Sequence, residues 1–253
     1  MSEAEPARQD AKVAHASSFG RGVDAYRAAR PGYPDEAVRW CVPPGARDVL
    51  DLAAGTGKLT ASLVALGLRV LAVEPDDAMR DALTDALPDV DARSGLAEHT
   101  WLPDACVDAV TVGQAWHWFE EPLAAAEVAR VLRPGGTLAV LWNDRDESVG
   151  WVRALGDLLR EAGGPPEARG RTFEPGDTFG PVERLDVRWS HPLAAGDVRR
   201  LAASRSYALV LPADERVALL DRVDELVATH PQTRGHERVD LPYVTRAYRC
   251  RLR

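Results

Sequence analysis

Two acidic residues and a pair of glycines have the types and spacing of a small-molecule site. Asp51 ends the apolar run VLD, and the turn AAGTG that follows carries Gly55 and Gly57. Glu74 ends the next apolar run, VLAVE. Glycines let a ligand approach the backbone closely, a carboxylate attracts an ammonium group, and a second carboxylate can accept hydrogen bonds from both hydroxyls of a ribose. The predicted chemistry is the binding of a ligand that joins an amino-acid head to a nucleoside.

Other nucleotide sites fit this turn less well. A phosphate-binding P-loop would need a glycine and a hydroxyl residue at the positions of Leu52 and Leu59. A dinucleotide-binding turn would need a third glycine at the position of Thr60. Asp51 would repel the pyrophosphate of such a ligand but would suit the ammonium group of S-adenosylmethionine (SAM). The sequence therefore favours SAM.

Each of these residues also has a structural interpretation. Gly55 and Gly57 could serve only to form the turn, Asp51 could cap it, and Glu74 could be a solvated cap of the next helix. The combination of all four favours a cofactor site over four separate structural roles.

The composition limits the classes of partner. The chain has 253 residues, of which 45% are hydrophobic, and a formal net charge of −8 with an isoelectric point near 5.3. This charge argues against nucleic acid as a partner and favours a small-molecule acceptor. Three scattered cysteines, Cys41, Cys106 and Cys250, predict neither disulfides nor a metal site. We expect a cytoplasmic protein without a membrane span, and the sequence leaves the oligomeric state open.

The elements that must position these residues follow an alternating pattern. Polar residues 1–17 predict a disordered tail, and residues 18–45 a turn-rich cap. The strands RDVLDLA and RVLAVE flank the helix KLTASLVALG, and the alternation continues through TLAVLW, which predicts a parallel sheet covered on both faces. Later we expect a strand in VERLDVRWS, helices near 195–206 and 213–229, and a last pair of short strands after residue 236.

Several segments resemble one enzyme family. VLDLAAGTGKLT, VLAVEPDDAM, GLAEHTWLPDACVDAVTVGQAWHWF and EVARVLRPGGTLAVLW are similar to the class I SAM-dependent methyltransferases, in particular to the type-eleven methyltransferase domain and its trans-aconitate-methyltransferase-like branch. The resemblance is strong over residues 19–145 and looser beyond them. It implies an α/β fold, a Rossmann-like doubly wound sheet of seven strands whose last strand is antiparallel, with helical cap and lid elements. The fourth of these segments contains RPGG, which we expect to form a turn before the strand TLAVLW.

The resemblance also implies a set of cofactor contacts along these segments. By motif, they are Asp51, Ala53, Gly55, Thr56, Gly57, Glu74, Pro75, Met79 against the adenine, Ala97 and Glu98 at the adenine edge, and Gln114. The sequence departs from the family pattern at Gly95, where an acidic residue is common. The residue that binds the adenine amino nitrogen is therefore not predicted from the motif.

The candidates for acceptor binding and catalysis lie in three other segments. Within AWHWF, His117 could be a general base, and Trp116 and Trp118 could wall the acceptor pocket, although aromatic residues at such a place often only pack. YRAARPGYP resembles the family's cap, which would bring Tyr26 and Arg30 near the cofactor or the acceptor; a surface helix is the alternative. SRSYALVLP is similar to a lid segment and supplies Arg205 and Tyr207, while Trp189 and Tyr243 are expected in the core.

Together these patterns predict one methyltransferase domain over residues 18–253, with a SAM-binding core at 46–145 and lid helices and final strands at 146–253. The expected enzyme moves the methyl group of SAM to an oxygen, nitrogen or carbon atom of a small-molecule acceptor, and needs no metal. A carboxylate or hydroxyl oxygen is one version of this hypothesis. Two alternatives are a SAM-binding protein that does not methylate and a NAD-dependent oxidoreductase, because a fold alone does not fix the reaction.

Overall fold

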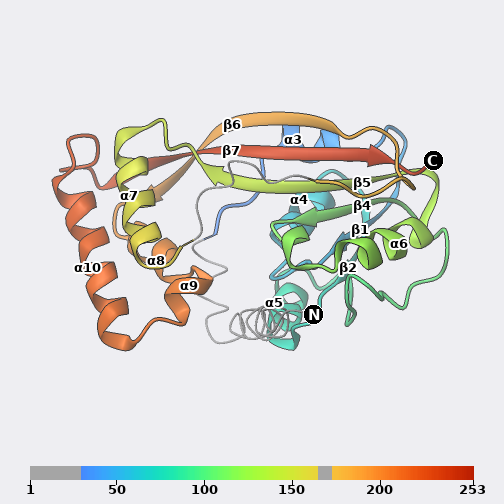
Figure 1. Cartoon of the computed structure of the whole chain (residues 1–253), viewed down its shortest axis with the longest axis horizontal. Coiled ribbons are helices and arrows are strands. Elements are labelled where there is room, and N and C mark those ends of the chain that lie inside the picture. Colours follow the sequence, from blue (N-terminus) through green and yellow to red (C-terminus); the bar gives the residue numbers. More distant parts are fainter. Residues whose placement is uncertain (1–29, 165–172) are drawn as a thin grey trace, which may run out of the picture. The chain divides into compact units, whose positions relative to one another are not determined.

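The structure, a computed structural model, describes residues 30–164 and 173–253, and its strands form one seven-stranded sheet. The order of the strands is β3-β2-β1-β4-β5-β7-β6 (Figure 1). The strands are β1 (Asp48–Leu52), β2 (Arg69–Val73), β3 (Asp91–Arg93), β4 (Val107–Gly113), β5 (Leu132–Arg145), β6 (Glu183–Ala194) and β7 (Arg238–Arg251).

Neighbours among the first five strands run parallel, and β7 runs antiparallel to β5 (Figure 1). The strand β1 pairs with β2 on one side and with β4 on the other, so the strand order reverses between β1 and β4. In sheets of this kind, ligands bind beyond the carboxyl ends of the strands at the reversal. The predicted doubly wound sheet with an antiparallel last strand is confirmed.

Helices lie where the sequence predicted them, in KLTASLVALG and at 213–229, with a shorter one in the expected stretch 195–206. In the described residues they are α3 (Asp35–Cys41), α4 (Lys58–Ala65), α5 (Asp77–Ala86), the short 3-10 helix η2 (Trp116–Trp118), α6 (Glu121–Val131), α7 (Gly150–Glu161), α8 (Asp197–Ala203), α9 (Ser206–Leu209) and α10 (Ala213–Thr229). Gly67 follows α4 with a φ of 80°, as a glycine after a helix commonly does. Among these helices, none has the length and apolar character that a membrane crossing requires.

Two predicted elements differ from the structure. The expected last pair of short strands was wrong, because β7 is a single strand of 14 residues. The predicted turn RPGG lies within β5, also of 14 residues, where a register shift against β4 between Val107 and Ala109 accommodates it.

The chain divides into two compact units, and β5, β6 and β7 contribute residues to both. The sheet unit comprises residues 32–143, 171–187 and 245–253. The helical unit comprises residues 1–31, 144–170 and 188–244. The single methyltransferase domain expected over residues 18–253 stays a prediction, and residues 1–29, with the expected tail, lie outside the described residues.

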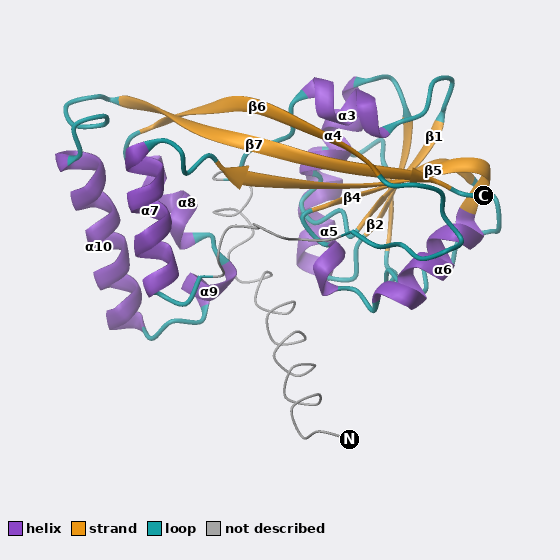
Figure 2. Cartoon of the chain, turned by 45° about the horizontal axis from the view of Figure 1, so that its top comes forward, coloured by secondary structure: helices purple, strands orange, loops and turns teal. Residues whose placement is uncertain are grey.

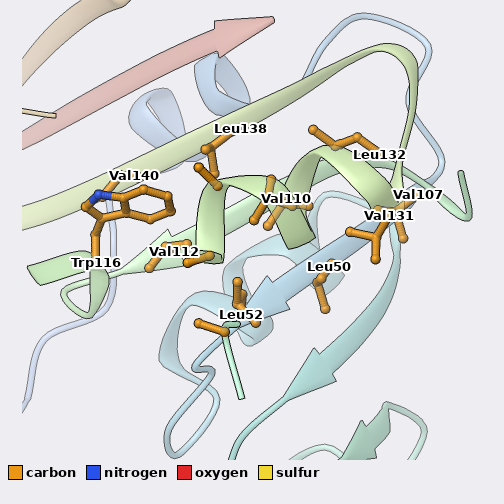
Figure 3. Packing of buried hydrophobic residues seen from close by; sticks show 14 of the residues in the cluster. Leu50, Leu52, Val107, Val110, Val112, Trp116, Val131, Leu132, Leu138 and Val140 are labelled. Atoms are coloured by element: carbon orange, nitrogen blue, oxygen red, sulfur yellow. The ribbon is translucent and has the colours of Figure 1, made fainter. Parts of the chain in front are cut away.

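The sheet unit is covered by helices on both faces of its sheet. Along β1, Leu50 and Leu52 belong to a cluster that includes α6, whereas Val49 belongs to a cluster that includes α3 and α4 (Figures 2 and 3). Successive side chains of a strand point to opposite faces, so β1 is buried on both sides. By the same alternation, Asp51 lies on the α4 face of the sheet, and the core thus places its carboxylate beside that helix.

The helical unit has its own apolar core. The helices α7, α8 and α10 pack together (Figure 2). Their side chains and those of the β7 residues before Val244 contribute to one buried cluster. The Tyr243 ring is 1% exposed and stacks on the Trp189 ring, with their centroids 5.4 Å apart. Tyr243 lies in the core as predicted, and Trp189 is half-buried and packs against this core.

Candidate cofactor and active site

The first turn of the sheet unit contains a buried carboxylate with one unused oxygen. Asp51, at 1% exposure, accepts a hydrogen bond through Oδ2 from the Thr60 hydroxyl, with the oxygens 2.6 Å apart. The Asp51 Oδ1 atom and the Thr56 hydroxyl are both buried and, within the described residues, have no hydrogen-bond partner. A buried polar atom without a partner destabilises the fold by about 1–3 kcal/mol, so this turn suits a polar ligand.

The two glycines of the turn have different roles. Both have a positive φ, of 56° at Gly55 and 82° at Gly57. A Cβ atom at Gly55 would meet nothing within 4 Å, which leaves the backbone open to a ligand. A Cβ atom at Gly57 would lie 2.9 Å from the Leu83 Cγ atom, so Gly57 is also needed for packing against α5. The positive φ fits the turn-forming interpretation for both glycines, and Gly55 also has space in front of it for a ligand.

Glu74 connects the end of β2 to this turn. Its Oε2 atom accepts a hydrogen bond from the Gly55 N–H group at 2.8 Å, and its Oε1 atom accepts one from the Asp76 N–H group at 3.0 Å. A carboxylate offers about four lone-pair positions, so these two bonds leave acceptor capacity for a ribose. The anchoring of Gly55 was not predicted from the sequence.

Burial dominates the electrostatics of the two carboxylates. Burial, with a further contribution from the Glu74 charge, raises the pKa of Asp51 to about 7, although the Thr60 hydrogen bond lowers it. Burial also raises the pKa of Glu74, against the hydrogen bonds from Asp76 and Gly55. A cationic group bound beside Asp51 would favour its ionised form.

The backbone is strained at the carboxyl ends of the two strands that flank the reversal. Ala53 follows β1 with a φ of 55°, and Gln114 follows β4 with a φ of 64°. An L-residue in this left-handed region is destabilised by roughly 1–2 kcal/mol, and such strain clusters at functional sites. Both residues belong to the predicted cofactor set, whose contacts stay predictions.

The predicted adenine contacts lie around α5 and the segment before α6. Met79 and Ala97 are buried, and Pro75 is exposed. The Glu98 Oε1 atom accepts a hydrogen bond from the Glu120 N–H group at 2.8 Å, at the start of α6. A Cβ atom at Gly95 would lie 2.9 Å from Val73 Cγ1, so any side chain at this position would have to displace Val73.

The AWHWF segment contains one core residue, one exposed residue and three half-buried residues. Trp116 is 1% exposed and lies in the apolar core beside Val140 (Figure 3). His117 is exposed and its ring lies 4.7 Å from the half-buried Trp118 ring, centroid to centroid. The burial of Trp116 favours packing for this residue. Its acceptor contact, and those of His117 and Trp118, stay predictions.

In the helical unit, two of the predicted acceptor segments meet. The Arg30 guanidinium donates to the Ser204 hydroxyl through Nε at 3.2 Å and to the Ser204 carbonyl through a terminal nitrogen at 3.1 Å. Ser204 directly precedes Arg205, and half-buried Tyr207 lies two residues further on. Tyr26 lies outside the described residues.

Two residues of the sheet unit were missed. Thr60 stands where a dinucleotide-binding turn would have its third glycine. Its position nine residues after Asp51 is the signal that could have identified its hydroxyl as the partner of that carboxylate. The Tyr33 hydroxyl lies against the end of β4, since a Cβ atom at Gly113 would be only 2.5 Å from it. No local sequence pattern predicts this second contact, because Tyr33 and Gly113 are 80 positions apart.

The geometry fits the SAM molecule that the sequence favours. Asp51 Oδ1 can accept from an ammonium group, the Thr56 hydroxyl can bond to a polar group of the same ligand, and Gly55 leaves the approach open. Glu74, at 7% exposure, retains acceptor capacity for hydroxyl donors. These observations support the predicted cofactor set without testing each contact.

Comparisons with known proteins agree. The family model described as "Methyltransferase domain" matches residues 50–140. "Uncharacterized methyltransferase Rv3342" of Mycobacterium tuberculosis (strain ATCC 25618 / H37Rv) is 49% identical over 93% of this chain and 96% of its own length. "Uncharacterized methyltransferase C25B8.09" of Schizosaccharomyces pombe is 34% identical, over 91% and 95% of the two chains.

A solved structure of a candidate type II methyltransferase from Anaeromyxobacter dehalogenans has a TM-score of 0.62 and 25% identity, and the match covers 88% of this chain and 97% of that one. These matches favour methylation over the two alternatives, and the trans-aconitate-like branch stays a prediction. The chain belongs to the methyltransferase family, whose cofactor is S-adenosylmethionine.

Proposed function

We propose that this methyltransferase acts on a small-molecule acceptor that carries a carboxylate or hydroxyl oxygen, and that the helical unit selects it. The observation that carries the proposal is the pair of hydrogen bonds from Arg30 to Ser204, which joins the cap segment to the segment of Arg205 and Tyr207. A guanidinium group can bind a carboxylate through two parallel hydrogen bonds, so Arg205, in the segment that Arg30 holds, favours an anionic acceptor.

In this proposal, the sheet unit holds the cofactor through Asp51, Thr56 and Glu74. When bound, SAM supplies an activated methyl group on its sulfonium. The residues of the chain then have to align the acceptor, exclude water and, where the acceptor oxygen is protonated, remove its proton. Exposed His117 is the proposed base for a hydroxyl acceptor, and a carboxylate acceptor would need none.

The experiment that tests this proposal uses SAM labelled in its methyl group and fractionated small-molecule extracts. Mass spectrometry should find the label in an acidic or hydroxylated compound, and the Arg205→Ala variant should transfer less of it at low acceptor concentration. Label recovered only in macromolecules would contradict the small-molecule acceptor. SAM binding without any labelled product would favour the alternative of a SAM-binding protein that does not methylate.

A further inference from the structure

The Thr60 hydroxyl and the Asp51 carboxylate form a buried hydrogen-bonded pair beside the turn that follows β1. Thr60 is 0% exposed and lies in the first turn of α4, and its hydroxyl donates to Asp51 Oδ2 at 2.6 Å. A threonine within a helix can instead donate to the carbonyl group four residues earlier. Here the hydroxyl is bonded to the carboxylate, which fixes the two oxygens in different environments.

The consequence is an asymmetric carboxylate. Oδ2 is occupied by Thr60, whereas Oδ1 is buried and has no partner within residues 30–164 and 173–253. Oδ1 therefore keeps its full acceptor capacity for a ligand donor, whereas Oδ2 already accepts one hydrogen bond. The ammonium group of SAM is such a donor, and its positive charge makes the ionised carboxylate the better acceptor.

We propose that Thr60 is a positioning residue for the cofactor: it holds Asp51 Oδ2 so that Oδ1 receives the cofactor's ammonium group, and binding releases a proton from Asp51 to solvent. This inference rests on the proposed role of Asp51 in the cofactor site. No covalent bond changes. The ammonium group replaces the carboxyl proton as the positive partner of the buried carboxylate.

The surrounding groups support proton release near neutral pH. Glu74, at the end of β2, is the charged group that raises the pKa of Asp51 besides burial, and the Thr60 hydrogen bond from α4 lowers it. On the other side, β4 pairs uncharged Thr111 with Asp51. With a pKa of about 7 in the free protein, part of the Asp51 population is protonated at pH 7 and has to ionise on binding.

The sign of the pH dependence follows. A bound ammonium group lowers the pKa of Asp51, so the affinity for the cofactor is highest above the free-state pKa and falls as the pH drops below it. We expect the affinity to rise about tenfold from pH 6 to pH 8, the range that brackets a pKa near 7.

The experiment is titration calorimetry with S-adenosylhomocysteine, which has the same amino-acid head and does not react. In the wild-type protein at pH 7, buffers of different ionisation enthalpy should reveal the release of about half a proton per ligand bound. Thr60→Val, which removes the hydroxyl and keeps the branched shape, should weaken binding about fivefold at pH 7 and move the midpoint up by about one pH unit.

Two variants serve as matched controls, and thermal melts should show that all variants are folded. Thr60→Ser keeps the hydroxyl and should restore the wild-type midpoint. Asp51→Asn keeps an acceptor for Thr60 but removes the titrating group, so the proton release should disappear.

Three results would distinguish the hypotheses. Binding by the wild-type protein without proton release would overturn the inference, even if Thr60→Val failed to fold. A folded Thr60→Val variant with the wild-type affinity and midpoint would also overturn it. An unaltered affinity in Asp51→Asn, in contrast, would contradict the proposed cofactor role of Asp51 itself.

Discussion

The sheet unit and the helical unit place their candidate residues through contacts of very different sequence separation. In the sheet unit, Thr60 binds Asp51 nine positions away, and Gly55 binds Glu74 nineteen positions away. In the helical unit, Arg30 binds Ser204 across 174 positions. Short separations appear in a sequence as motifs, whereas the pairing of distant segments is set by tertiary packing. The comparison explains why the candidate cofactor residues form recognisable sequence motifs, whereas the meeting of the two candidate acceptor segments is not visible in the sequence.

The largest effect is expected at the packed glycine of the sheet unit. Gly57→Ala should lower the free energy of unfolding by about 3 kcal/mol, because it combines a left-handed backbone with a Cβ atom too close to Leu83. Gly55→Ala is the matched control, since it has the backbone strain without the steric contact, and should lose only about 1 kcal/mol. Equal losses in urea denaturation would show that the two glycines do not differ.

The features of the sheet unit that could be predicted are those set by residues close together in the sequence. The alternating apolar runs indicated the βα order correctly, and in the structure Gly67 follows α4 and Pro122 lies in the first turn of α6. The length of β7 could not be predicted, because its continuous pairing depends on the distant strands β5 and β6. The core position of Trp116 was also not apparent, since its neighbour Phe173 is far along the chain and their rings meet only in the fold, with centroids 5.2 Å apart.

The next largest effect concerns catalysis. If His117 is a general base, His117→Gln should lower turnover about 100-fold, and the affinity for SAM should hardly change. His99→Gln is a matched control in the same unit, because His99 is also exposed and its ring lies 3.9 Å from that of Trp101, centroid to centroid. Steady-state kinetics with the labelled acceptor measure both. Similar turnover in the two variants would indicate that His117 has no role as a base.

A smaller effect tests the link between β2 and the first turn. Glu74→Ala should weaken S-adenosylhomocysteine binding by about 2 kcal/mol in calorimetry, because it removes the ribose acceptor and the anchor of the Gly55 N–H group. Asp76→Ala is the control: it removes the cap on the Met79 N–H group, and should lower the unfolding free energy by about 1 kcal/mol with little change in binding. If Asp76→Ala weakened binding as strongly, the effect of Glu74→Ala would be attributed to a shift of α5 and not to the loss of a ribose acceptor.

The smallest effect is expected in the helical unit, and it tests whether the long-range pairing serves the acceptor. Arg30→Lys keeps the charge but cannot donate to both Ser204 oxygens with the geometry of a guanidinium group. We expect it to raise the acceptor KM about fivefold, corresponding to about 1 kcal/mol, with unchanged affinity for S-adenosylhomocysteine. Ser204→Ala, which removes one of the two acceptors, should raise KM less.

Arg205→Ala and Tyr207→Phe complete this test, because they change the same segment without touching the bond to Arg30. If the helical unit selects the acceptor, both should raise the acceptor KM and leave cofactor binding intact, since residues that contact the acceptor affect its recognition more than that of the cofactor. Equal losses of acceptor and cofactor affinity, or no loss of either, would contradict the division of roles. The hydrogen bonds between Arg30 and Ser204 would then only hold the helical unit together, as buried polar contacts commonly do.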